Sequence, residues 1–211
     1  MIAEPMTLAT DYALAAANAL FGFRLLRAEN LPRRLWGFGF LALSVSALVG
    51  GSFHGFAPML SGAASAVLWE ITELAVGTAS FLLLIAVVHL YTTRGLRKAL
   101  RAFAAAKYVV YVAWMATHDE YLFVIYDTGL TLAIMILLSL AALSLWHHSA
   151  AKWLLGGVAV SIVAAIAQSS GIRLHTHFTH NDLYHVIQLI AMYLLYRGGL
   201  LFGVALECRA R

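Results

Sequence analysis

Residues 66–91 read AVLWEITELAVGTASFLLLIAVVHLY, and apart from the final tyrosine the ionisable side chains in this stretch are Glu70, Glu73 and His89. A helix needs about 20 predominantly apolar residues to cross a hydrocarbon core roughly 30 Å thick. This stretch is longer than that, and both of its carboxylates lie near its beginning. It therefore predicts a transmembrane helix whose first turns are polar.

The rest of the chain repeats this pattern. Of its 211 residues, 62% are hydrophobic and 11% are charged, and the mean hydropathy is +0.83, which excludes an ordinary soluble domain. Backbone groups in lipid must be hydrogen-bonded within their own segment, so open-ended spans are helices. We predict an all-α polytopic membrane protein, a seven-helix bundle forming a single transmembrane domain over residues 1–211. The predicted spans are approximately 11–27, 35–54, 66–91, 100–117, 121–146, 151–170 and 181–204.

The basic residues predict the orientation of this bundle. They flank the first, third and fifth connections and the C-terminal end, whereas the other connections contain only Arg173. By the positive-inside rule, the N-terminus lies outside and the C-terminus is cytoplasmic. No tract of Lys and Arg with interleaved aromatics indicates nucleic acid, so membrane lipid is the expected partner. The first ten residues lack the features of a cleavable signal peptide.

Cys208 is the single cysteine of the chain. It excludes an intrachain disulfide, a thiolate metal cluster and a CxxC redox pair. We interpret it as a residue without a functional role.

With this orientation, polar side chains gather at the outer ends of the spans. Ionisable groups in a bilayer cost roughly 2.5–3.5 kcal/mol each on insertion scales, so they tend to face a cavity and serve a function. We therefore predict a pocket that opens to the outer side. The side chains in this layer are His54, Glu70, Glu73, His118, Asp119, Glu120, Asp127, Gln168, Ser169, Ser170, His180, Asn181, Asp182, His185 and Gln188.

Histidines in this layer are candidate metal ligands. Neutral imidazole is a usual zinc ligand, and catalytic zinc sites keep three protein ligands and one open position. His54 and His185 are the first two candidates, and the third is His180 or His177. Thr179 predicts an N-cap that starts the last helix at His180. Positions 180 and 185 are then about 140° apart on a regular helix, so they converge only if the first turn unwinds.

Carboxylates in the same layer are candidate catalytic groups. Glu70 and Glu73 are three residues apart and share a helix face, where either one would orient a ligand histidine or take a proton from metal-bound water. Asp127 follows about two turns into the fifth span and is a further candidate.

Three short segments resemble a known membrane superfamily. Phe53-His54, the helix start Leu68-Trp69-Glu70-Ile71-Thr72-Glu73-Leu74, and Asn181-Asp182-Leu183-Tyr184-His185-Val186 are similar to the pattern of the alkaline ceramidases and the adiponectin and progestin receptors. That superfamily carries Ser-x-x-x-His on its second span, Asp on the third and His-x-x-x-His on the seventh. Its three histidines hold zinc, and it hydrolyses amide or ester bonds in lipids.

The chain departs from this pattern at three positions. Gly50 stands at the serine position, with Ser46 one turn away and Ser52 on another face; the acidic residue is a glutamate; and Asn181 replaces the first histidine of the last motif. The resemblance implies that His54 and His185 are zinc ligands, that His180 is the third, and that Glu70 or Glu73 activates a water. Ser52 is carried as a further catalytic candidate.

The sequence thus predicts a zinc-dependent membrane hydrolase that acts on an amide or ester bond of a lipid. Two alternatives remain open. A proton-coupled transporter would use Asp127, Glu73 and His185 as a relay, although the chain shows no inverted repeat. A scaffold or partner subunit would use the polar layer as a hydrogen-bonded network between helices. A retinal photoreceptor is excluded, because residues 181–204 contain no lysine for a Schiff base.

Overall fold

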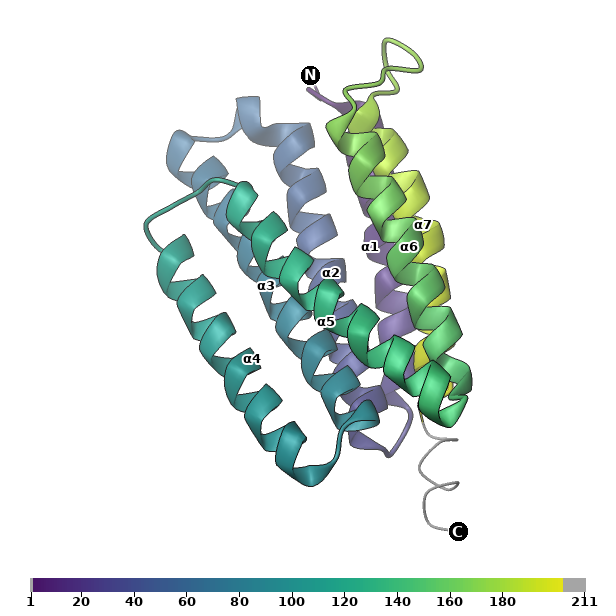
Figure 1. Ribbon diagram of the computed structural model, residues 1–211. Coiled ribbons are helices and arrows are strands. Elements are labelled where there is room, and N and C mark those ends of the chain that lie inside the picture. Colours follow the sequence, from purple (N-terminus) through teal and green to yellow (C-terminus); the bar gives the residue numbers. More distant parts are fainter. Residues whose placement is uncertain (1, 203–211) are drawn as a thin grey trace.

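The computed structural model describes residues 2–202 and is all-helical (Figure 1). Successive helices alternate in direction, so that α1, α3, α5 and α7 begin at the end of the bundle drawn uppermost in Figure 1. We call this the upper end and the opposite one the lower end. Cys208 and the predicted end of the last span at residue 204 lie outside the described residues. The helices found in the described range are α1 (Pro5–Leu26), α2 (Leu31–Phe56), η1 (Ala57–Met59), α3 (Gly62–Tyr91), α4 (Arg94–Met115), α5 (Leu122–Trp146), α6 (Ser149–Ser169) and α7 (His180–Leu200).

Local capping groups explain where several helices begin. The Asn30 side chain accepts a hydrogen bond from the backbone N–H of Arg33 at the start of α2, and the Ser61 hydroxyl accepts one from Ala64 at the start of α3. At α7, the Asp182 carboxylate accepts from the backbone N–H of Thr179 at 2.6 Å. The predicted helix start at His180 is therefore confirmed, and it follows from a capping box.

Within the described residues, four helical segments are long and apolar enough to cross a membrane: α2 together with η1, α3, α5 and α6. The other helices carry more polar residues. α1 begins at Pro5, earlier than the sequence predicts, because Thr7 and Asp11 are buried against the bundle and do not end the helix. The chain has the composition and helix lengths of a membrane protein.

Several large side chains are fully buried at the lower end of the bundle. Trp36 is fully buried there and donates from its indole nitrogen to the backbone oxygen of Leu195 at 3.1 Å. A side chain at Gly199 would collide with the Trp36 ring, so glycine permits this close contact between α2 and α7. Phe21 stacks on Tyr196 with ring centroids 4.5 Å apart. The lower half of the bundle thus fixes α1, α2 and α7 against one another.

Candidate functional site

A pocket of about 330 Å³ lies near the upper end of the bundle, where several helices contribute polar side chains. Along α7, Asn181, His185, Gln188 and Met192 line it at successively lower levels, so its lower part contains both apolar and amide side chains. The lining residues are Asp11, Leu14, Asn18, Leu43, Ser46, Ala47, Gly50, His54, Trp69, Thr72, Val76, Tyr121, Gln168, Asn181, Tyr184, His185, Gln188 and Met192.

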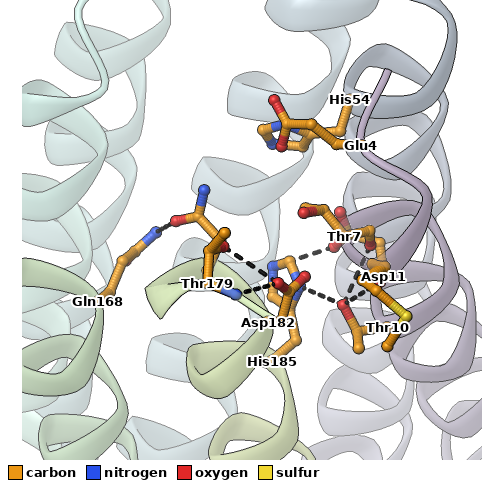
Figure 2. Close-up of polar contacts among 11 residues, drawn as sticks. Glu4, Thr7, Thr10, Asp11, His54, Gln168, Thr179, Asp182 and His185 are labelled. Atoms are coloured by element: carbon orange, nitrogen blue, oxygen red, sulfur yellow. Dashed lines mark hydrogen bonds and ion pairs between the residues drawn. The ribbon is translucent and has the colours of Figure 1, made fainter. Parts of the chain in front are cut away.

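The inner histidine of this pocket pairs with a carboxylate of α1. His185 Nε2 lies 3.2 Å from Asp11 Oδ1, and its Nδ1 lies 3.0 Å from the Thr10 hydroxyl (Figure 2). Only 9% of the His185 side chain and 7% of the Asp11 side chain are exposed. Both ring nitrogens are therefore engaged, and the pair ties α1 to α7 below the mouth of the pocket.

A second histidine–carboxylate pair lies nearer the solvent. His54 Nδ1, at the end of α2, is 3.2 Å from Glu4 Oε2, and 25% of the His54 side chain is exposed. Figure 2 shows this pair apart from the Asp11–His185 pair. His54 Nε2 makes no hydrogen bond to any residue in the described part of the chain. His54 therefore lines the pocket with an imidazole that Glu4 orients and whose Nε2 has no partner among the described residues.

Side-chain amides complete the polar wall. Gln168 Nε2 donates to Asn181 Oδ1 at 3.5 Å, linking the end of α6 to the start of α7. This contact uses the oxygen of Asn181 and leaves its amide hydrogens available to a ligand. Gln188 donates to the Ser161 hydroxyl at 3.2 Å. The pocket therefore combines two imidazoles with amide groups that can bind a carbonyl.

Comparison with known proteins places the chain in a family but assigns no activity. The model described as "Family of unknown function (DUF6962)" matches residues 6–203. The chain belongs to this family. The matched region contains every residue that lines the pocket, whereas Glu4 precedes it. No curated protein and no solved structure matches the chain.

In this DUF6962 chain, the predicted metal ligands are only partly brought together. His54 and His185 line the same pocket. His180 does not line it: the first turn of α7 is regular, which leaves His180 about 140° from His185, and its Nδ1 is buried without a hydrogen-bond partner. His177 is exposed in the connection before α7.

In the described part of the chain, the side chains around His54 and His185 do not make up a set of zinc ligands. A catalytic zinc site needs three protein ligands. Among residues 2–202, no group of three His, Cys, Asp or Glu side chains is arranged to hold a metal ion. His185 Nδ1 is hydrogen-bonded to Thr10 and its Nε2 is paired with Asp11, and Asn181 stands at the position of the superfamily's other histidine. As arranged here, these side chains do not form a zinc site, so zinc stays a prediction.

The two predicted acidic residues of α3 lie at different angles around the helix axis and differ in exposure. Thr72 faces the pocket. Glu73 is 2% exposed on the adjoining side of the helix, and its Oε1 has no hydrogen-bond partner. Glu70 is exposed. Neither carboxylate lines the pocket.

Two other predicted catalytic residues also lie outside the pocket lining. The Ser52 hydroxyl is 3.0 Å from the Tyr12 hydroxyl and donates to the backbone oxygen of Leu48. Asp127 forms a buried ion pair with Lys107 of α4. Lys107 also donates to the Ser80 hydroxyl at 3.2 Å. The sequence reasoning did not identify Lys107, although it is a lysine in an otherwise apolar stretch, AFAAAKYVVYVAW.

The main residue that sequence reasoning missed is Asp11. In the sequence, Asp11 is only the first residue of the first predicted span. Thr7, Asp11 and Asn18 are all buried and follow one another at helical spacing on one face of α1. This polar stripe in an apolar helix was the signal that α1 faces a polar site.

Proposed function

We propose that the chain is an integral membrane protein whose seven helices all span the bilayer, with the N-terminus outside and the C-terminus cytoplasmic. The distribution of charge supports this orientation. Basic residues occupy the lower end, as in the first turns of α4, whereas Arg173 is the one arginine or lysine in the upper connections. Under the positive-inside rule the lower end is cytoplasmic, and the pocket opens to the outer side.

We further propose that this protein hydrolyses an amide or ester bond of a lipid in the pocket. The observation that carries the proposal is that two histidines, each paired with a carboxylate, line one pocket whose lower part contains several apolar side chains. A carboxylate that holds one imidazole nitrogen orients the other for proton transfer. Apolar walls such as Leu43, Val76 and Met192 suit an acyl chain.

His54 is the general base in this mechanism. Its Nε2 takes a proton from a water as the water oxygen bonds to the carbonyl carbon, and Glu4 stabilises the imidazolium. The Asn181 amide donates to the carbonyl oxygen as it becomes negative. The carbon–oxygen or carbon–nitrogen bond then breaks, and His54 returns the proton to the leaving alcohol or amine. The Asp11–His185 pair holds α1 and α7 together in the wall of the pocket.

The test is fatty-acid release from synthetic lipid esters and amides by the purified protein. His54→Gln should lower release by about 10²–10⁴-fold. His118→Gln is the matched control, because His118 lies near the upper end but stacks on Trp114 outside the pocket. If the wild type releases no fatty acid from either lipid class, or if both variants are equally active, the proposed hydrolysis is wrong.

The buried Lys107–Asp127 pair supports a second candidate, a proton-coupled transporter. Asp127 Oδ2 has no hydrogen-bond partner, and Ser80 and Thr131 form a hydroxyl pair at 2.8 Å beside it. Such a cluster within a bundle is typical of proton relays. The discriminating experiment is proton flux into proteoliposomes, which should be lost in a Lys107→Met/Asp127→Leu variant if this candidate is right.

A further inference from the structure

A second hollow of the molecule lies at the lower end, beside the first turns of α4. It has a volume of about 690 Å³, and none of its lining residues is shared with the upper pocket. α4 stands at the edge of the bundle in Figure 1 and packs mainly against α3. The floor is apolar and the rim is basic. The apolar lining residues are Leu35, Phe81, Ile85, Ala102 and Ala105, and the basic ones are Arg94, Arg97, Lys98 and Arg101.

The four basic side chains form one stripe. Arg94, Arg97, Lys98 and Arg101 are spaced i, i+3, i+4 and i+7, which places them on one face of α4. The first turn of α4 contains no acidic residue. The positive end of the helix dipole adds to the same charge. Stacked like charges at this position are unfavourable unless an anion neutralises them.

Within residues 2–202 no carboxylate does so. None of the four side chains forms an ion pair with another described residue. Arg97 donates to the backbone oxygen of Thr92 at 2.6 Å, while its Nε is buried without a hydrogen-bond partner. The positive-inside rule explains why basic residues lie at this end. The rule does not explain why Arg97 Nε lacks a hydrogen-bond partner beside an apolar hollow.

We propose that this hollow binds one anionic phospholipid. Guanidinium groups match the oxygens of a phosphate in charge and geometry, and basic pockets between transmembrane helices bind anionic headgroups. Leu35, Phe81 and Ile85 supply a surface that an acyl chain covers and a soluble anion leaves bare. The site is independent of the proposed hydrolysis, because it lies at the opposite end of the bundle.

Native mass spectrometry of the purified full chain tests this directly. The protein is mixed with phosphatidylglycerol or phosphatidylcholine of the same acyl chains, and the lipid retained per chain is titrated. We expect one phosphatidylglycerol to be retained and phosphatidylcholine to be lost. Because each basic group near a membrane anion contributes about fivefold in affinity, Arg97→Gln/Arg101→Gln should weaken phosphatidylglycerol binding roughly 30-fold.

The matched control is Arg27→Gln/Lys152→Gln, which removes two exposed basic residues of the same end that do not line the hollow. It should bind as the wild type does. Arg94→Gln/Lys98→Gln repeats the test with two exposed side chains if the first double variant does not fold. Equal retention of both lipids, equal losses in the control, or displacement by an equal concentration of inorganic phosphate would overturn the proposal.

Discussion

Two buried pairs, each formed by a carboxylate and a basic side chain, differ in what surrounds them. Asp11–His185 and Lys107–Asp127 have side chains less than a tenth exposed, so burial alone does not distinguish them. The first pair lines a pocket that also holds His54, whereas the second is enclosed by α3, α4 and α5 and lines no described pocket. A buried charge thus points to chemistry only where a ligand reaches it. We interpret the first pair as part of a site and the second as a connection between helices.

The largest effect should come from the pocket. His54→Gln removes the proposed base, and positioned proton transfer contributes about 10²–10⁴-fold to rate. We expect fatty-acid release to fall by that factor while the unfolding temperature stays unchanged, since His54 is partly exposed. If a folded Lys107→Met/Asp127→Leu variant lost as much activity as His54→Gln, the interpretation of the Lys107–Asp127 pair as a connection between helices would be wrong.

Substitutions in the enclosed Lys107–Asp127 pair should change the stability of the protein. Asp127→Ala leaves Lys107 buried without its partner, which costs about 3–5 kcal/mol. Lys107→Met/Asp127→Leu removes both charges and should recover most of that loss. Thermal unfolding in detergent measures both variants. A double variant that is as unstable as the single one would mean that the pair does more than neutralise itself.

Measuring bound metal tests whether the pocket lined by His54 and His185 holds the predicted zinc. If the predicted zinc is bound, His54→Gln and His185→Gln should each lower its affinity, and His180→Gln should not, because a regular first turn directs His180 away. Elemental analysis of the variants measures the bound zinc. Zinc loss in His180→Gln alone would show that the first turn of α7 rearranges.

The smallest effects should separate the two glutamates of α3. Glu70 is exposed, so Glu70→Gln should change stability by less than about 0.5 kcal/mol. Glu73 is buried with an unpaired oxygen, and Glu73→Gln replaces a group whose charged form is costly there. We expect that variant to be at least as stable as the wild type and to keep activity, because Glu73 does not line the pocket. Loss of activity in Glu73→Gln would restore the water-activating role that the sequence suggests.

Local sequence signals predicted the helices well. The apolar runs predicted an all-α fold, which the described residues confirm, and Thr179 with Asp182 predicted the start of α7. These features depend on residues close together in the chain. The seven spans as a membrane topology stay a prediction, since four helical segments meet the criteria of length and composition.

The site was harder to predict because it depends on rotation about helix axes and on partners from distant helices. Thr72, and not its neighbour Glu73, faces the pocket, and no spacing rule reveals that difference of one position. Asp11 meets His185 only because α1 packs beside α7. Lys107 meets Asp127 in the same way across α4 and α5.

The central claim is that the pocket adds water to a lipid carbonyl. The most direct measurement is mass spectrometry of the fatty acid released by the purified protein in water enriched in a heavy oxygen isotope. We predict one heavy oxygen in each fatty acid released by the wild type and by His118→Gln, and no release above background by His54→Gln. Fatty acid without the heavy oxygen, or release that persists in His54→Gln, would contradict the account.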